Sequence, residues 1–316
     1  MAKIGIDAGH YLYEPGRHCW KEFDPNMTKE WVLNDRVADW LEVYLKSAGH
    51  EPIRMDDPTG ETLINIYKRA DIANDLEVDY YVSIHHNGGV NGGKGGGTVV
   101  YIWPEAEAGG TTERAQKAIY DKVISRGGLK GNRSNPLEKA YFVVISRTNM
   151  SACLIECGFM DSATDVPFII DPEWSKKVAL GIAEGICEIF GGSVKLDDVE
   201  HKDKVVNEEV NEVSFKDYLS DMYVTHLGRQ PDEAGLKYWE QILAEDKMTL
   251  EQVQDAIIVS DEGCKRFVTE LYVFLLGRQP DKIGLEHWIN ELKNGKTRNE
   301  VFTAFINSAE YKKLKK

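Results

Sequence analysis

Histidines and carboxylates stand at the ends of several β-rich runs in the first half of the chain. Asp7–His10 (Asp-Ala-Gly-His) ends the first run, and Ser83–Asn87 (Ser-Ile-His-His-Asn) ends a later one. Glu156 closes an apolar run, and Glu30 begins an amphipathic helical pattern. In an open α/β sheet, ligands bind in the crevice beyond the carboxyl ends of the strands. These polar side chains are therefore expected to meet in one crevice.

Two histidines and two carboxylates form a donor set that suits hydrolysis assisted by zinc. A catalytic zinc ion commonly keeps two histidines and one carboxylate as ligands and leaves one position for water. The metal lowers the pKa of that water to about 7, so hydroxide is available at neutral pH. A further carboxylate that does not bind the metal passes the proton to the leaving amine. The pattern therefore indicates amide hydrolysis as one candidate chemistry.

Other interpretations of the same residues stay open at the level of residue type. A histidine at a strand end is more often a hydrogen-bonded structural residue than a metal ligand, and most glutamates are solvated surface charges. Glu156 follows an apolar run, where a carboxylate is costly without a partner, so its alternative role is an ion pair with a nearby arginine. Spacing alone does not decide between these roles.

Alternating strand and helix patterns fill the chain up to about residue 190. The helical patterns span about 25–47, 63–76, 113–125 and 173–190. The β-rich runs are Lys3–Asp7, Pro52–Met55, Tyr80–His85, Thr98–Trp103, Tyr141–Ile145 and Ala152–Glu156. Strands that alternate with helices favour an α/β fold with a twisted, mostly parallel sheet flanked by helices. We therefore expect one α/β domain over residues 1–192.

The rest of the chain differs in composition and contains an internal repeat. Residues 193–213 are rich in charged residues and poor in aromatic ones, which predicts a flexible linker. Within residues 214–316, Leu227–Asp232 recurs as Leu276–Asp281, and Gly235–Trp239 recurs as Gly284–Trp288, both at an offset of 49. Repeats of this length stack to share one core. We therefore expect a small all-helical C-terminal domain made of two repeats.

Five short motifs follow one another in the order of a known enzyme family. They are Asp7–His10, Glu30 with Asn34, Arg69 with Ala73 and Asn74, Ser83–Asn87, and Glu156–Phe159. Residues 1–192 thereby resemble the type 3 family of N-acetylmuramoyl-L-alanine amidases, which are zinc hydrolases of peptidoglycan. Each motif is weak by itself, but their common order makes the resemblance specific.

The resemblance implies a role for each matching residue. Carried over position by position, it makes the zinc ligands His10, Glu30 and His85. It makes Glu156 the catalytic carboxylate and places Asn87 in the substrate groove. The motif order aligns His85, and not His86, with the ligand, and alternation along a strand puts these two side chains on opposite faces. Arg69 and Asn74 are expected to be scaffold.

Two segments depart from the family pattern or add to it. Tyr11-Leu12 stands where the family has Gly-Gly, and His18 in the following segment is a rival metal ligand. The glycine-rich run 88–97 lacks the Gly-Lys-Ser/Thr ending of a phosphate-binding loop, so we expect a flexible loop beside the site. These features concern loop shape and substrate preference and leave the expected zinc site intact.

The C-terminal repeats resemble the domain of unknown function 4214, which occurs on bacterial and phage extracellular proteins. This resemblance rests on the Leu-Gly-Arg-x-Pro-Asp and Gly-Leu-x-x-Trp motifs and implies no chemistry. Four aromatic residues are interpreted as core rather than as sugar-stacking residues: Trp239, Trp288, Tyr238 and Tyr311. We expect the domain to bind the cell wall and to tether the enzyme to it.

Composition argues against several other classes of protein. The net charge of −14 argues against a nucleic-acid partner, since phosphate contacts need clustered lysine and arginine. No apolar run approaches roughly 18 residues, which argues against membrane insertion. The N-terminus lacks the pattern of a secretory signal. We therefore expect synthesis in the cytoplasm and action on the wall after release, which depends on a holin if the chain is a phage endolysin.

These observations together predict an N-acetylmuramoyl-L-alanine amidase. It would hydrolyse the amide between N-acetylmuramic acid and L-alanine of bacterial peptidoglycan through zinc-activated water, as a phage or prophage endolysin. A zinc carboxypeptidase or endopeptidase acting within the stem peptide would use the same metal site and is the first alternative. A catalytically inactive wall-binding protein is the second, although the complete candidate site speaks against it. The sequence does not predict the oligomeric state.

Overall fold

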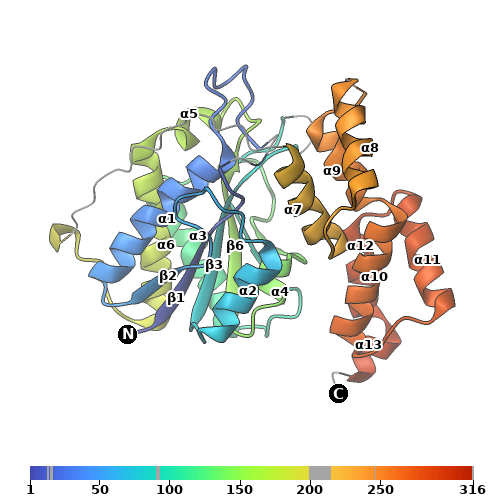
Figure 1. Cartoon of the computed structure of the whole chain (residues 1–316). Coiled ribbons are helices and arrows are strands. Elements are labelled where there is room, and N and C mark those ends of the chain that lie inside the picture. Colours follow the sequence, from blue (N-terminus) through green and yellow to red (C-terminus); the bar gives the residue numbers. More distant parts are fainter. Residues whose placement is uncertain (13, 15–16, 90–92, 199–214, 246, 315–316) are drawn as a thin grey trace. The chain divides into compact units, whose positions relative to one another are not determined.

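The chain folds into two compact units, Met1–Val210 and Asn211–Lys316 (Figure 1). The computed structural model describes residues 1–314 apart from 13, 15–16, 90–92, 199–214 and 246. Within these described residues, no helix is long and apolar enough to cross a membrane.

One six-stranded sheet organises the first unit. Its strands are β1 (Lys3–Ala8), β2 (Glu51–Arg54), β3 (Tyr80–Asn87), β4 (Val99–Ile102), β5 (Leu137–Lys139) and β6 (Ser151–Phe159). They lie in the order β2-β1-β3-β6-β4-β5, and all neighbours are parallel except β4 and β6. The predicted α/β fold with a mostly parallel sheet is confirmed. The carboxyl ends of β1, β3 and β6 meet side by side at one edge.

Helices cover both faces of this sheet. The helices α1 (Glu30–Ser47), α3 (Thr111–Ser125) and α6 (Pro172–Phe190) lie on one face, and α2 (Ile66–Asp75) and α4 (Val143–Ser146) lie on the other (Figure 1). The short helix α5 (Val166–Ile169) contacts β6 and α6. Helix α6 begins where the Asp171 side chain accepts a hydrogen bond from the Glu173 N–H, with Pro172 in the first turn.

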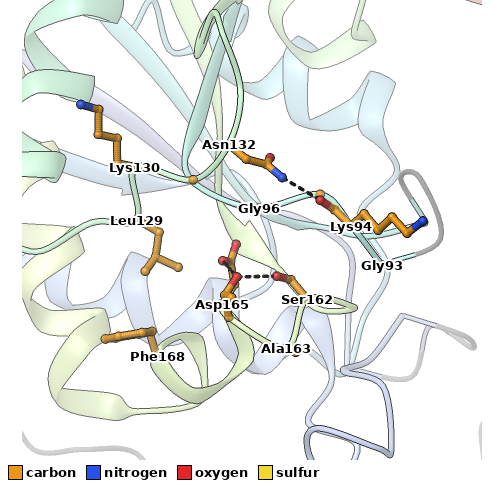
Figure 2. A pocket seen from close by; sticks show the side chains of 13 residues that line it. Gly93, Lys94, Gly96, Leu129, Lys130, Asn132, Ser162, Ala163, Asp165 and Phe168 are labelled. Atoms are coloured by element: carbon orange, nitrogen blue, oxygen red, sulfur yellow. Dashed lines mark hydrogen bonds between the residues drawn. The ribbon is translucent and has the colours of Figure 1, made fainter.

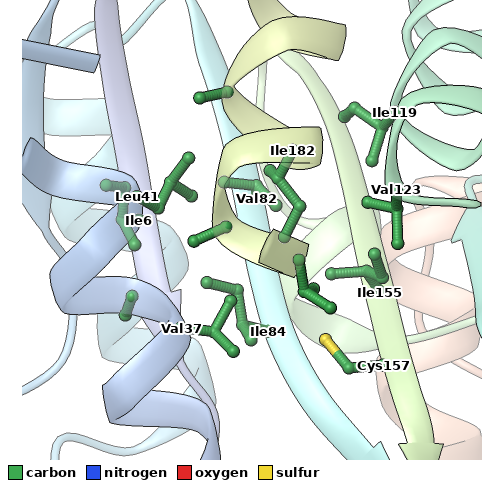
Figure 3. Packing of buried hydrophobic residues seen from close by; sticks show 14 of the residues in the cluster. Ile6, Val37, Leu41, Val82, Ile84, Ile119, Val123, Ile155, Cys157 and Ile182 are labelled. Atoms are coloured by element: carbon green, nitrogen blue, oxygen red, sulfur yellow. The ribbon is translucent and has the colours of Figure 1, made fainter. Parts of the chain in front are cut away.

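The larger core lies between the sheet and α1, α3 and α6. Figure 3 shows strand residues that face helix residues across this layer, among them Ile6, Val82, Ile84 and Ile155 against Val37, Leu41, Ile119, Val123 and Ile182. A second cluster, which includes Tyr81 and Leu154, packs under α2 and α4. Because side chains alternate along a strand, Ile84 and His86 point to the α1 face, while Ser83 and His85 point to the α2 face.

Two predicted elements differ from the structure. The predicted strand Tyr141–Ile145 is wrong, because Val143–Ser146 forms α4 and the strand in this region is β5. Val144 and Ile145 are buried on the sheet, so tertiary packing overrides the β-propensity of this run. The first long helix begins at Glu30 and not near residue 25. Asp24 accepts hydrogen bonds from the N–H groups of Asn26 and Thr28 and holds the preceding residues in a turn.

The predicted linker, residues 193–213, lies outside the described residues from 199 onward. Its first part contacts the first unit: Val194 packs against the core, and the Lys195 N–H donates to Ser47 Oγ at 3.2 Å. Leu196–Asp198 forms a short 3₁₀ helix beside α1. The packed part of the first unit therefore reaches beyond residue 192.

The described secondary structure of the second unit is all helical, as predicted. Its helices are α7 (Phe215–Leu227), α8 (Glu233–Ala244), α9 (Leu250–Ile258), α10 (Asp261–Leu276), α11 (Lys282–Lys293), α12 (Arg298–Asn307) and α13 (Ala309–Leu314). The aspartates of the repeated motif cap the helices that follow them. Asp232 accepts a hydrogen bond from the Gly235 N–H at 2.7 Å, and Asp281 accepts one from the Gly284 N–H at 2.8 Å.

The arginine of each repeated motif is also used within the fold. Arg229 donates two hydrogen bonds to Glu262 at the start of α10, and Arg278 donates two to Glu310 at the start of α13. We call each of these pairs a clasp. The repeated signature is therefore explained by helix capping and helix-to-helix attachment.

Most aromatic residues of the repeats lie in the core, as interpreted from the sequence. Trp239 packs in the core of the first repeat, with its Nε1 3.1 Å from the Tyr223 hydroxyl. Trp288 packs against Phe305, and Tyr311 is buried. Tyr238 differs, because 57% of it is exposed.

Candidate active site

Three of the predicted site residues lie together at the carboxyl edge of the sheet. His10 follows β1, His85 lies near the end of β3, and Glu30 is the first residue of α1. His10 Nε2 is 3.1 Å from Glu30 Oε2, and His85 Nδ1 is 3.1 Å from Glu30 Oε1. One donor atom from each residue lies within 4.8 Å of the other two. No other group of this kind occurs in the described part of the chain.

The backbone around residue 9 leaves space for this cluster. The rings of His10 and His85 pack edge to face with 5.0 Å between their centroids. A Cβ atom at Gly9 would lie 2.1 Å from the His85 ring, so a larger residue there would displace it. His10 itself has a left-handed backbone with a φ of 67°. Such a conformation costs a non-glycine residue roughly 1–3 kcal/mol and persists only where its surroundings impose it.

A buried arginine of α2 fixes the end of β1. Arg69 forms an ion pair with Asp7 and donates to the carbonyls of Ala8 at 2.6 Å and His10 at 2.5 Å. Asp7 also accepts hydrogen bonds from the hydroxyls of Tyr81 and Ser83. Burial raises the pKa of Asp7, but Arg69 and Ser83 outweigh it and hold this pKa below its usual value. Arg69 thus supports the site without entering it.

On the other face of the sheet, Asn34 braces the same loop. Its amide donates to the Gly9 carbonyl at 3.0 Å, and its oxygen lies 2.8 Å from His86 Nδ1. Because Asn34 Oδ1 is an acceptor, His86 Nδ1 is the donor in this pair. Burial lowers the pKa of His86 to about 3, so the ring is neutral. The side chain of His86 therefore lies outside the donor cluster. On α1, Glu30 contacts the two histidines of the cluster, and Asn34 one turn later contacts Gly9 and His86.

Glu156 lies on β6, directly across from His85 on β3. Its residue is half-buried, and its Oε2 is shielded from solvent with no hydrogen-bond partner among the described residues. Burial raises the pKa of Glu156 to about 7. No lysine or arginine in the described part of the chain forms an ion pair with it, so the structure gives no support to the ion-pair interpretation. A carboxyl group with a pKa near 7 suits proton transfer at neutral pH.

Glu14 is a site residue that the sequence reasoning missed. Its Oε2 lies 2.7 Å from His10 Nδ1, on the side of the ring opposite Glu30. The only signal in the sequence is its spacing of four residues from His10, and this spacing alone does not predict a contact. Burial lowers the pKa of His10, but Glu14 and Glu30 outweigh it and raise that pKa to about 10.

The remaining predicted residues lie at the margin of the cluster. Asn87 Oδ1 accepts a hydrogen bond from the Gly88 N–H at 2.8 Å, and its role in substrate binding stays a prediction. The rival ligand His18 points its Nδ1 at the Cys19 carbonyl, 2.9 Å away, and is not part of the cluster.

The glycine-rich run lines a cavity of about 640 Å³ beyond the end of β6. Residues 90–92 of this run lie outside the described residues, while Gly93–Gly96 form one wall. Figure 2 shows Leu129 and Phe168 on one side of the cavity and Lys94 on the other. Asp165 holds the loops together, because its Oδ2 accepts hydrogen bonds from the N–H groups of Gly97 and Phe159.

The donor cluster fits a zinc ion in type and in spacing. Ligand atoms bound at about 2.0–2.1 Å in a tetrahedron lie about 3.3 Å apart, and one donor atom from each of the three residues lies within 4.8 Å of the other two. Two imidazoles and one carboxylate are a frequent set for catalytic zinc. Glu14 adds negative charge beside the cluster, which favours a cation there.

The first unit has the fold of solved peptidoglycan amidases. The catalytic domain of CwlV, an amidase from Bacillus (Paenibacillus) polymyxa var. colistinus, matches with a TM-score of 0.53 and 24% identity. The match covers 61% of this chain and all of that one. The N-acetylmuramoyl-L-alanine amidase from Clostridium difficile 630 matches with a TM-score of 0.53 and 25% identity, over 60% of this chain and 96% of that one.

Sequence comparison defines the family. Residues 4–188 match the N-acetylmuramoyl-L-alanine amidase family, so the chain belongs to this family of peptidoglycan hydrolases. The sporulation-specific amidase of Bacillus subtilis is 29% identical over 192 residues, 60% of this chain and 69% of that protein. The endolysin of Bacillus phage SPP1 is 29% identical over 187 residues, 59% of this chain and 65% of that protein. Residues 203–267 and 263–315 match the domain of unknown function 4214. The two family matches confirm the predicted resemblance of each part of the chain.

The Asp7–Arg69 pair generates a prediction about stability. Arg69→Met leaves the Asp7 carboxylate buried without its cation, and such a loss costs roughly 3–5 kcal/mol. We expect the calorimetric unfolding transition of the first unit to move to lower temperature by a corresponding amount. Lys68→Met, at the exposed neighbouring position, is the control and should stay within about 0.5 kcal/mol of the unmodified chain. Equal stability of the two variants would contradict the role given to Arg69.

Proposed function

We propose that this amidase cleaves the bond between N-acetylmuramic acid and L-alanine with a zinc ion held by His10, Glu30 and His85. The observation that carries the proposal is the convergence of three donor atoms within 4.8 Å, next to the shielded and unpartnered Glu156 oxygen. Structural ion pairs do not require such an arrangement, because a buried carboxylate without a partner is costly.

The residues divide the work as follows. When bound, zinc supplies a Lewis acid that makes water nucleophilic near neutral pH. His10 offers Nε2 and His85 offers Nδ1, and Glu30 offers its carboxylate between them. Glu156 takes the proton from the attacking water and returns it to the amino group of the departing L-alanine. Asn87, at the end of β3, is proposed to contact the substrate beside these groups.

A zinc peptidase acting within the stem peptide remains the alternative with the same donors. Membership of the amidase family favours the sugar–peptide amide. Mass spectrometry of fragments from purified wall separates the two. An amidase releases whole stem peptides that begin with L-alanine, and a peptidase leaves shortened stems on the glycan. A wall-binding protein without activity would release neither, and the complete donor set argues against it.

We propose a phage or prophage endolysin as the biological role. The similarity to the endolysin of phage SPP1 supports this role, while the similarity to a sporulation amidase supports wall remodelling by a bacterium. Expression together with a holin distinguishes them. Rapid lysis of the host is the result expected of an endolysin, and wall turnover without lysis would favour the bacterial role.

The zinc ligands generate the first functional prediction. We expect His85→Ala to contain almost no zinc by elemental analysis, since it removes one of three protein donors. His86→Ala should stay loaded, because His86 bonds to Asn34 and lies outside the cluster. Zinc lost from His86→Ala and kept in His85→Ala would show that the wrong histidine was assigned.

The proton carrier generates the second prediction. Glu156→Gln keeps the size of the side chain but cannot titrate, so we expect turnover to fall by roughly 10²–10⁴-fold. Zinc content and melting temperature should stay those of the unmodified chain. Glu51→Gln, an exposed carboxylate at the start of β2, is the control. A destabilised but fully active Glu156→Gln would remove the catalytic assignment.

We further propose that the second unit binds the wall and tethers the first. Each repeat carries an exposed ring beside its core tryptophan, Tyr238 next to Trp239 and His287 next to Trp288, both with 4.9 Å between ring centroids. Each ring contacts its neighbouring tryptophan and is otherwise exposed, so it is available to stack on sugars. The domain boundaries near residues 192 and 214 are part of this proposal.

Truncation tests the tether. A chain of residues 1–198 keeps the contacts of Val194 and Lys195 and should hydrolyse soluble wall fragments at the rate of the full chain. It should bind intact cell walls more weakly, because a tether raises the local concentration without new contacts at the site. Equal binding of both chains in a sedimentation assay would favour a spacer or assembly role for the repeats.

A further inference from the structure

Glu14 holds the ring of His10 from the side that does not face the cluster. Its Oε2 lies 2.7 Å from His10 Nδ1, while Nε2 of the same ring faces Glu30. An ionised carboxylate is only an acceptor, so Nδ1 carries the proton in this pair. We propose that Glu14 is a positioning residue that fixes the tautomer and orientation of His10, so that Nε2 is free to bind zinc. This inference rests on the proposed zinc site.

His10 needs such a brace more than His85 does. His85 lies within β3, and its ring fills the space beside Gly9. His10 lies beyond the end of β1 on a strained, left-handed backbone, and Arg69 fixes only its carbonyl. The side chain of His10 is therefore held by its neighbours and not by regular structure. Of these, Glu14 contacts the nitrogen that does not face the cluster.

The residues that depart from the family pattern after His10 make contacts that hold the segment carrying Glu14. Tyr11 and Leu12, which replace two glycines, are both buried. Leu12 packs with Trp31 and Val32 in the first turn of α1, and its N–H donates to the Gly60 carbonyl at 3.0 Å. The Glu14 N–H donates to the Tyr11 carbonyl at 3.1 Å, which ties Glu14 to the residue that follows His10. Leu12 thus anchors the loop on the helix that supplies Glu30.

The environment of Glu14 is consistent with an ionised carboxylate. Its side chain is only 10% exposed, and Arg17 Nε lies 3.9 Å from its other oxygen. Carboxylates that accept a hydrogen bond from a metal-binding histidine raise its basicity, and their loss costs roughly 10–100-fold in metal affinity.

Zinc affinity of the full metal-free chain tests the inference, with Zn²⁺ alone titrated against a coloured chelator. We expect Glu14→Ala to bind zinc roughly 10–100-fold more weakly than the unmodified chain. Glu14→Gln still accepts a hydrogen bond through its amide oxygen and should lie between the two. Glu22→Gln removes an exposed carboxylate from the same segment and should match the unmodified chain. The visible spectrum of the Co²⁺-loaded protein should change in Glu14→Ala and not in Glu22→Gln.

The outcomes separate this inference from the proposed zinc site. Unchanged zinc affinity in a folded Glu14→Ala or, if that variant does not fold, in Glu14→Gln would overturn the role of Glu14. A lowered melting temperature of the metal-free variant with unchanged affinity and Co²⁺ spectrum would show a merely structural role and would overturn it equally. Failure of the unmodified chain to bind zinc would overturn the metal site itself.

Discussion

The ion pair between Asp7 and Arg69 is the constraint on which the rest of the site depends. A carboxylate buried at the end of a central strand is tolerable only with a cation and further hydrogen bonds, which Arg69, Tyr81 and Ser83 supply. The same guanidinium then binds the carbonyls of Ala8 and His10, where the chain leaves the sheet. One interaction thereby stabilises the strand end and sets the path of the loop. Arg69 thereby helps to hold His10 in its left-handed backbone conformation.

The alternation of side chains along β3 assigns adjacent histidines to different tasks. His85 faces the α2 side of the sheet with Glu156 across from it, while His86 faces α1 and holds Asn34. Helix α1 begins at the boundary between these two environments. Its first residue, Glu30, reaches the histidine cluster, and Asn34 one turn later bonds to the Gly9 carbonyl. The motifs Glu30 with Asn34 and Ser83–Asn87 therefore each contain a residue of the donor cluster and a residue whose hydrogen bonds hold the site in place.

The sequence predicted the sheet and the meeting of His10, Glu30 and His85 because strand ends and helix starts are local signals that the family pattern reinforces. It failed where long-range packing decides. Val144 and Ile145 belong to a β-prone run but form a helix, because that helix buries them on the sheet. Glu14 was missed because its contact with His10 depends on a loop anchored by Leu12 against α1.

The clasps of the second unit have a consequence for how such chains change over evolution. Ser308 before α13 and Glu310 in its first turn correspond to Ser260 before α10 and Glu262 in its first turn. Each serine accepts a hydrogen bond from an N–H of the helix that follows, and each glutamate accepts hydrogen bonds from an arginine of the preceding repeat. Helix α13 is thus the opening turn of a further copy, and each junction is complete with one arginine and one glutamate. Duplication of a whole repeat would add the arginine and the glutamate that attach it to its neighbour. The module is therefore open to lengthening or shortening in units of one repeat while the hydrolase stays unchanged.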